Sequence, residues 1–257
     1  MKRTAFLLYG VMVYALFQAA FLYLIGFVGN ILVPTSIGGP LEVPLWQAII
    51  TNIGLVLLFA VQHSIMARLW FKRWWTQYVP EPIERSTFCL FTVIVLGILY
   101  LFWQPMGSTL WNIENGLITG MLWAIFALGW TIVLLSTFMI NHFDLFGLRQ
   151  VWLYFQKKPY THLKFKVPLF YKYVRHPLYF GIILAFWAAP TMSAGRFFFA
   201  VLFTLYILKG IQLEEKDLVT FFGDRYRKYA KRVPMIIPTF RRKKDSQPTF
   251  ETIIKGN

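Results

Sequence analysis

Long apolar runs alternate with short polar stretches along the whole chain. A helix needs about 20 residues to cross roughly 30 Å of hydrocarbon. Four apolar runs meet that length or come close to it: 4–28, 44–67, 86–103 and 117–141. A fifth apolar block, 178–213, is interrupted at 189–196 by APTMSAGR, whose proline, serine and glycine favour a turn. The pattern predicts an all-α, polytopic membrane helix bundle of five to six apolar helices that ends in a C-terminal helical hairpin.

The two ends of the predicted hairpin differ in character. Its first arm, 178–190, would span roughly 20 Å at 1.5 Å per residue, too short to cross a bilayer alone. From residue 217 onward, apolar residues recur at three- and four-residue steps among Lys and Arg, which is typical of an interfacial amphipathic helix. Such a helix lies on anionic lipid in the simpler interpretation, and caps a site in the alternative.

These boundaries predict one membrane domain over 1–257. We divide it into a four-helix membrane half (1–141), a part with a loop, the hairpin and the interfacial helix (142–238), and a tail (239–257). Apolar residues make up 57% of the chain and charged residues 14%, which is far from soluble globular usage. Cys89 is the sole cysteine, so no internal disulfide can form, and we expect it to pack inside a span.

Basic residues are distributed by side of the membrane. Lys2 and Arg3 precede the first run, four basic residues lie in 68–85 and seven in 149–175, whereas the loops 29–43 and 104–116 have none. The positive-inside rule then places both termini in the cytoplasm. We therefore attribute the net charge of +15 to topology and expect a bilayer partner but no nucleic acid. The expected protein is integral to a membrane and multi-pass, and the oligomeric state stays open.

Polar groups gather where the hairpin begins, in YKYVRHPLYFG at 171–181. Pro177 fits the first turn of a helix, whose free amide groups, together with Arg175, would attract a carboxylate or phosphate. His176 lies about 17 residues before the turn and Glu214 about 21 after it, so their levels differ by only about 6 Å at 1.5 Å per residue, and the hairpin brings His176 and Tyr179 near Glu214.

Two of these features have simpler explanations. Glu214 and Glu215 could lie among lipid headgroups, paired with Lys209 or Lys216. A glycine at 181 could admit a ligand, or it could allow close helix packing.

Two further polar clusters end on the same side. VQHS at 61–64 contributes His63, and NHFDLFGLRQ at 141–150 contributes His142, Asp144 and Arg149. A lone histidine at such a place is more often a hydrogen-bonded interfacial residue than a catalyst. Because four predicted helices deliver polar groups to one rim, we expect a site there that receives a cytosolic small molecule and is open laterally to an apolar one.

YKYVRHPLYFG and the later LEEKDLVTFFGDRYRKYAKRVPMIIP at 213–238 resemble the C-terminal half of integral membrane methyltransferases of the isoprenylcysteine carboxyl methyltransferase kind. This resemblance covers about 160–238. QHS and NHFDLFGLRQVW further resemble the nurim-related branch, whose enzymatic members are bacterial methanethiol S-methyltransferases that make dimethyl sulfide. The resemblance implies an S-adenosylmethionine-dependent enzyme of a bacterial inner membrane, with its cofactor-binding loop in the 142–238 part.

The resemblance also implies cofactor-binding residues. The family's contacts fall on His162, Leu163, Tyr171, His176, Pro177, Leu178, Tyr179 and Glu214, with Gln156 as a looser match. Three further residues are expected to bind the cofactor: Arg175 beside the start of the helix, Gly181 where a ligand could approach closely, and Glu215 beside Glu214. No metal site is expected.

One departure from the carboxyl-methylating pattern bears on the acceptor. Those enzymes carry an arginine before the acidic run, where this chain has Gly210, so a small thiol fits better than a prenylcysteine carboxylate. We expect in-line methyl transfer to a thiolate, with His142 oriented by Asp144 as first candidate base, His63 as second, and Arg149 stabilising the thiolate. The alternatives are a larger lipid or prenylated thiol or carboxylate as acceptor, and a non-catalytic, nurim-like structural membrane protein.

Overall fold

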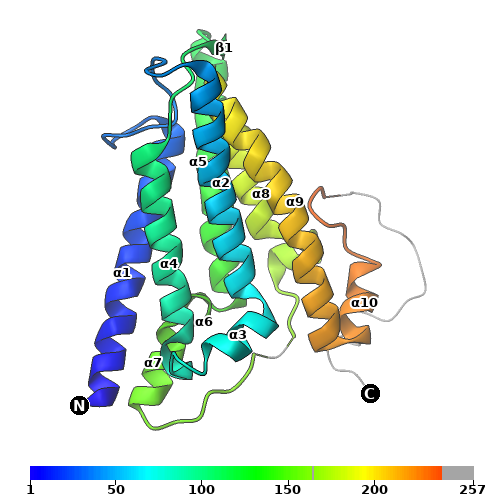
Figure 1. The fold of residues 1–257 in the computed structure, drawn as a ribbon. Helices are drawn as coiled ribbons and strands as arrows, with labels where there is room; N and C mark the ends of the chain where they lie inside the picture. The colour runs from blue at the N-terminus through cyan, green and yellow to red at the C-terminus, as the bar shows by residue number, and fades with distance from the viewer. Residues whose placement is uncertain (164, 239–257) are drawn as a thin grey trace.

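Five helices are long and apolar enough to cross a membrane. In the computed structural model, which describes residues 1–163 and 165–238, they are α1 (Lys2–Gly29), α2 (Leu45–Ala67), α4 (Glu81–Phe102), α5 (Gly116–Ile140) and α9 (Ala194–Phe222). A sixth apolar helix, α8 (Pro177–Trp187), has only 11 residues and forms a hairpin with α9. The predicted all-α membrane bundle with five to six apolar helices is confirmed (Figure 1).

Short elements connect the long helices. They are α3 (Leu69–Trp75), β1 (Thr109–Asn112), α6 (His142–Leu145), α7 (Leu148–Phe155), the 3-10 helix η1 (Leu169–Lys172), β2 (Thr191–Ser193) and α10 (Asp224–Ala230). The strands β1 and β2 pair antiparallel, with Thr109 opposite Ser193 and Asn112 opposite Thr191. This small ribbon attaches the loop after α4 to the turn of the hairpin, and the apolar pattern did not predict it.

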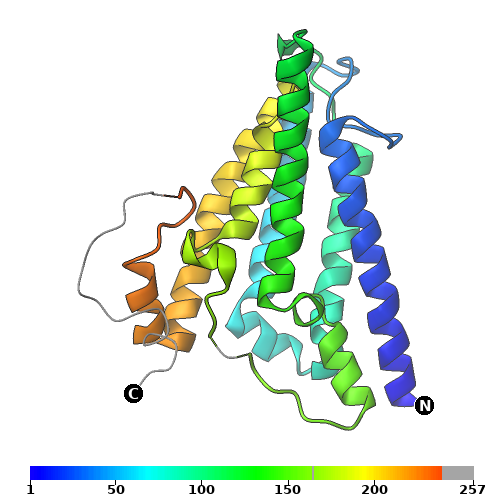
Figure 2. The ribbon, with the colours of Figure 1, turned by 180° about the vertical axis from the view of Figure 1, so that it is seen from behind.

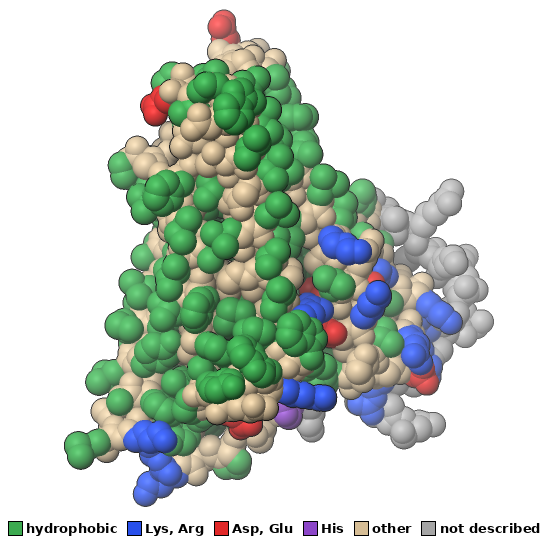
Figure 3. All heavy atoms as spheres, viewed as in Figure 1, with side chains coloured by type: hydrophobic (Ala, Val, Ile, Leu, Met, Phe, Trp, Pro, Cys, Tyr) green, Lys and Arg blue, Asp and Glu red, His purple; other side chains and the backbone are tan. Residues whose placement is uncertain are grey.

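The helices converge toward the end that carries β1 and spread toward the end that carries the N-terminus and α10 (Figures 1 and 2). Hydrophobic side chains cover the flank of the bundle, while Lys and Arg gather toward the wide end (Figure 3). Leu57, Leu128 and Leu205 are among the large apolar residues with at least half of their surface exposed. An exposed apolar flank of this length indicates a multi-pass membrane protein.

Two glycines allow α5 and α8 to pack with their backbones in contact. A Cβ atom at Gly129 would lie 2.7 Å from the Gly181 carbonyl oxygen, and one at Gly181 would lie 2.6 Å from the Gly129 oxygen. Gly181 therefore faces α5 rather than a ligand, and the helix-packing alternative accounts for it.

Arg196 stabilises the far end of the short helix α8. Its side chain is 4% exposed, and its guanidinium donates to the backbone oxygens of Ala185, Phe186 and Ala188 at 2.9–3.4 Å. These carbonyls belong to the last turn of α8 and have no helical partner. A cation at the C-terminus of a helix also opposes the negative end of the helix dipole, so α8 can end inside the bundle.

The C-terminal helix begins later than the sequence pattern predicts. Helix α9 continues to Phe222 and stops at Gly223, whose φ of 57° breaks the helix, so the interfacial segment is the short α10. Tyr226, Tyr229 and Val233 are buried against the loop before α8, in a cluster with Val167. The segment therefore covers the loop that leads into the hairpin, as in the capping alternative. The predicted tail, 239–257, lies outside the described residues.

Candidate functional site

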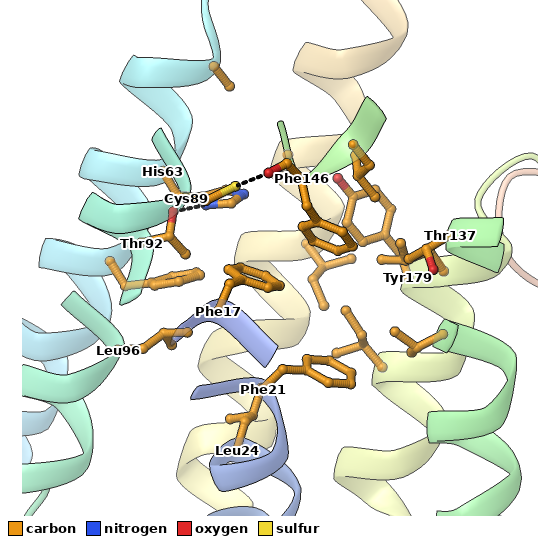
Figure 4. A pocket seen from close by; sticks show the side chains of 18 of the residues that line it. Phe17, Phe21, Leu24, His63, Cys89, Thr92, Leu96, Thr137, Phe146 and Tyr179 are labelled. Atoms are coloured by element: carbon orange, nitrogen blue, oxygen red, sulfur yellow. Dashed lines mark hydrogen bonds between the residues drawn. The ribbon is translucent and has the colours of Figure 1, made fainter. Parts of the chain in front are cut away.

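A cavity of about 450 Å³ lies at the centre of the bundle and is lined from α1, α2, α4, α5, α8 and α9. Its deep part is apolar, with Phe21, Trp130 and Phe199 among the lining residues. Its polar lining residues include His63, Arg68, Arg85, His142, Tyr179 and Glu214. In Figure 4, His63 and Thr92 lie on one side of the cavity and Tyr179 on the other, with the rings of Phe17 and Phe146 between them. The cavity thus has a wall from α2 and α4 that faces a wall from α8 and α9.

The α8–α9 wall contains a carboxylate oxygen without a hydrogen bond. Glu214 Oε2 is buried and has no hydrogen-bond partner in the described part of the chain. His176 Nδ1 lies 3.9 Å away, so the hairpin brings these two residues together as its geometry predicts. A buried carboxylate oxygen without a partner is costly. A ligand that carries an ammonium group or hydroxyl groups would satisfy it.

Glu215, next in sequence, is fully engaged within the protein. Arg175 Nε donates to Glu215 Oε1 at 2.6 Å, and His176 Nε2 lies 3.0 Å from the same oxygen. Arg175 Nη1 also donates to the carbonyl oxygens of Ala230 and Val233 at 2.6 and 2.8 Å. The pairing of Glu215 with Lys209 or Lys216 is therefore not found. Arg175 joins α9 to the segment around α10, and its donors are not free for the carboxylate that the sequence assigned to it.

The remaining residues predicted to bind cofactor lie in three places. Leu178 and Tyr179 line the central cavity beside Glu214. His162, Leu163 and Tyr171 line a second cavity of about 320 Å³. Tyr171 in the second cavity lies close to Glu214 in the central one. Burial raises the pKa of Tyr171, and the negative charge of Glu214 raises it further. Gln156 is exposed and lines neither cavity, while Pro177 is buried at the start of α8.

His142 uses both of its ring nitrogens within the protein. The Thr137 hydroxyl donates to the Leu134 carbonyl at 2.6 Å, so it accepts from His142 Nδ1 at 2.8 Å. His142 Nε2 then accepts a hydrogen bond from the Tyr14 hydroxyl at 2.8 Å. Burial lowers the pKa of His142, which favours the neutral ring.

The predicted orientation of His142 by Asp144 is wrong. Asp144 pairs instead with Arg149, with Nη1 and Oδ1 2.8 Å apart. Arg149 also donates to the backbone and side-chain oxygens of Thr161 and lines the second cavity. Asp144 and Arg149 therefore form one structural pair, and neither lines the central cavity.

His63 differs from His142 because one of its nitrogens is free. Thr92 donates its hydroxyl hydrogen to the Phe88 carbonyl at 3.0 Å, so it can only accept from His63 Nδ1, 3.4 Å away. This contact favours the tautomer with hydrogen on Nδ1 and a lone pair on Nε2. Across the residues that the structure describes, Nε2 has no hydrogen-bond partner. The geometry therefore favours His63 over His142 as a base.

Sequence reasoning missed Arg85, Thr92 and Asp217 in the cavity lining. Arg85 was counted only as a loop charge, and Thr92 lies inside an apolar run. One signal could have revealed the α4 contribution: Arg85, Phe88, Cys89 and Thr92 recur at steps of three, one and three residues, which places them on one helix face.

Comparison with known proteins identifies the family. The chain is 51% identical to the methanethiol S-methyltransferase of Crocosphaera subtropica over 238 residues, 93% of each chain. It is 48% identical to that of Mycobacterium tuberculosis over 93% of this chain and 98% of the relative. Nurim of Xenopus laevis is 31% identical over 68% of each chain. No family model and no solved structure matches the chain. The chain belongs to the family of methanethiol S-methyltransferases.

Proposed function

We propose that this protein transfers a methyl group from S-adenosylmethionine to methanethiol, which yields dimethyl sulfide and S-adenosylhomocysteine. The observation that carries the proposal is the free, buried Glu214 oxygen in a cavity whose opposite wall holds a histidine with a free nitrogen. The cofactor supplies an electrophilic methyl group on a sulfonium. Family membership supports the same reaction, because the relatives that match most of the chain are named for it.

The α8–α9 wall suits the cofactor's polar groups. Glu214 Oε2 would accept from its ammonium or from a ribose hydroxyl. The first amide groups of α8, beginning after Pro177, have no helical partners and would bind its carboxylate. The Arg175 side chain is engaged with Glu215 and with the carbonyl oxygen of Ala230. Binding of the cofactor's carboxylate therefore depends on these amides rather than on that side chain.

The α2–α4 wall suits the acceptor. A simple alkanethiol is a weaker acid than a cysteine thiol, whose pKa is about 8.5, so ionisation needs help at neutral pH. His63 Nε2 accepts the proton and passes it to water at the wide end of the bundle. The thiolate sulfur forms the new C–S bond, and the sulfonium C–S bond breaks with its electron pair retained on that sulfur. Alignment of the two reactants in one cavity supplies much of the rate enhancement.

Orientation in the membrane follows from the charge distribution and is part of the proposal. The basic wide end faces the cytoplasm, which contains S-adenosylmethionine. Methanethiol is small and apolar and can also enter from the bilayer between the splayed helices.

The test is production of dimethyl sulfide together with binding of S-adenosylhomocysteine. Membranes that contain the protein are supplied with methanethiol and methyl-deuterated S-adenosylmethionine, and the headspace is analysed for labelled dimethyl sulfide. Glu214→Gln is expected to weaken S-adenosylhomocysteine binding by about tenfold or more, because a neutral amide binds an ammonium poorly. Glu114→Gln, in the loop at the opposite end, is the control. Absence of labelled product, or binding unchanged in Glu214→Gln, would overturn the proposal.

A further inference from the structure

Two arginines line the central cavity, and they differ in their partners. Arg68 Nη1 lies 2.8 Å from Asp217 Oδ2, so a carboxylate neutralises its charge. Arg85, the fifth residue of α4, has no carboxylate within 4 Å of its guanidinium among the residues that the structure describes. A partly buried cation that no carboxylate contacts favours binding of a negative group.

Arg85 is held in place while most of its donors stay available. Its Nε donates to the Leu145 carbonyl at 2.8 Å, and its guanidinium lies over the Phe88 ring, 5.1 Å from the centroid. A guanidinium has five N–H donors, and the Leu145 contact uses one of them. The side chain is therefore oriented by the protein, and the remaining donors can bind a ligand.

The surroundings of Arg85 form a compartment for a small, soft ligand. Phe88, Cys89 and Thr92 share its face of α4, and the ring centroid of His63 from α2 lies 4.9 Å from that of Phe88. Phe146 closes the compartment, since Cys89 Sγ donates to its carbonyl at 3.9 Å (Figure 4). The titratable and charged groups near Arg85 are His63 from α2, Lys72 from α3, Glu84 and Cys89 from α4, and Tyr160 after α7. Across the cavity, Glu214 lies on the other wall.

We infer that Arg85 binds the methyl acceptor as a thiolate and that the α2–α4 wall around it is the acceptor subsite. This inference rests on the proposed function and replaces Arg149 in the role that the sequence assigned to it. The S–H bond of the thiol breaks, its electron pair stays on sulfur, and the proton passes to His63 Nε2 and then to water. The guanidinium of Arg85 offsets the negative charge on sulfur until methyl transfer removes that charge. The aromatic walls exclude water and leave the thiolate reactive.

Steady-state kinetics at different pH values test the role of Arg85. Arg85→Gln is expected to lower kcat/KM for methanethiol at pH 7 by about 10- to 100-fold, and Arg85→Lys to retain most of it. The deficit of Arg85→Gln should shrink as the pH approaches the pKa of free methanethiol, because solvent then supplies the thiolate. Arg73→Gln removes a charge from the exposed face of the neighbouring α3 and is the matched control. An Arg85→Gln variant with wild-type kcat/KM at pH 7, or with the same deficit at every pH, would refute the inference.

A second readout does not depend on turnover. Carbon-13-labelled methanethiol is titrated by NMR on protein saturated with S-adenosylhomocysteine, and the methyl shift reports the pKa of the bound thiol. That pKa should lie below the free value in the wild type and rise in Arg85→Gln, while S-adenosylhomocysteine binding stays unchanged and shows that the variant is folded. An equal pKa in both proteins contradicts the subsite. Failure of the wild type to methylate methanethiol contradicts the proposed function itself, so the two failures are distinguishable.

Discussion

Two threonine hydroxyls orient the two cavity histidines in the same way, and a tyrosine hydroxyl makes them differ. Thr137 and Thr92 each donate to a helix carbonyl, so each can only accept from the neighbouring histidine. The second nitrogen of His142 is taken by Tyr14, whereas that of His63 has no partner in the part of the chain that is described. The two histidines of the cavity therefore differ in their ability to accept a proton, because the Tyr14 hydroxyl of α1 occupies the second nitrogen of His142.

Exchange of each histidine should separate these roles. We expect His63→Gln to lower kcat/KM for methanethiol about 100-fold at pH 7, within the range for loss of a general base, with activity partly restored at high pH. His142→Gln should keep most of its turnover and lose thermal stability, because Tyr14 and Thr137 lose hydrogen-bond partners inside the protein. The reverse pattern in purified protein would assign the base to His142.

The pH dependence of stability should include a contribution from His142. Burial lowers its pKa in the folded protein below the ordinary value of 6.5, so the unfolded chain binds the proton more readily than the folded one. The neutral ring then contributes fully to stability above about pH 6.5, and its contribution is lost as the pH falls from there toward the folded pKa. We expect the midpoint of thermal unfolding in detergent to fall over this acidic range, and to fall less in His142→Gln. Equal slopes in both proteins would show that other groups dominate.

At the level of elements, the contact between α5 and α8 depends on two glycines that have no room for a side chain. The Cβ of Gly181→Ala would lie 2.6 Å from a backbone oxygen of α5, and the neighbouring backbone cannot yield cheaply. Gly97→Ala in α4 would meet nothing within 4 Å. We expect Gly181→Ala to lose about 1–3 kcal/mol through overpacking, and Gly97→Ala to gain up to about 1 kcal/mol through helix propensity. Thermal unfolding of both variants in one detergent tests this, and equal midpoints would contradict the close contact.

The sequence predicted the elements whose cause is local. Apolar runs of about 20 residues gave the spans, and Pro177 gave the start of α8, because length and the missing amide hydrogen act within the segment itself. The local sequence pattern could not predict contacts between segments that are distant along the chain. The β1–β2 ribbon depends on pairing across about 80 residues, and the stop of α9 at Gly223 rather than near residue 217 depends on α10 folding back to bury Tyr226 and Tyr229.

On the scale of the whole molecule, the site is assembled from walls that are distant in sequence. Hairpin geometry predicted the meeting of His176 and Glu214, since both belong to one local motif. Arg85 and His63 both lie against Phe88, and Arg149 pairs with Asp144. Both arrangements depend on how α2, α4 and the α6–α7 segment pack. A list of polar residues on one rim could not distinguish a cation paired with a carboxylate from one facing a cavity. This distinction is the reason why we assign thiolate binding to Arg85 instead of Arg149.

The proposed orientation of the bundle can be tested directly, because a cofactor from the cytoplasm would have to enter the cavity from the basic end. Single cysteines are placed in a Cys89→Ala background, which has no other thiol. Ser108→Cys lies at the β1 end and Lys158→Cys at the basic end, and both positions are exposed. A membrane-impermeant maleimide added to intact cells should label Ser108→Cys alone, and both after the membrane is opened, because the basic loops stay on the cytoplasmic side. Labelling of Lys158→Cys in intact cells would direct the basic end outward, and S-adenosylmethionine would then have no route to Glu214 from the compartment that contains it.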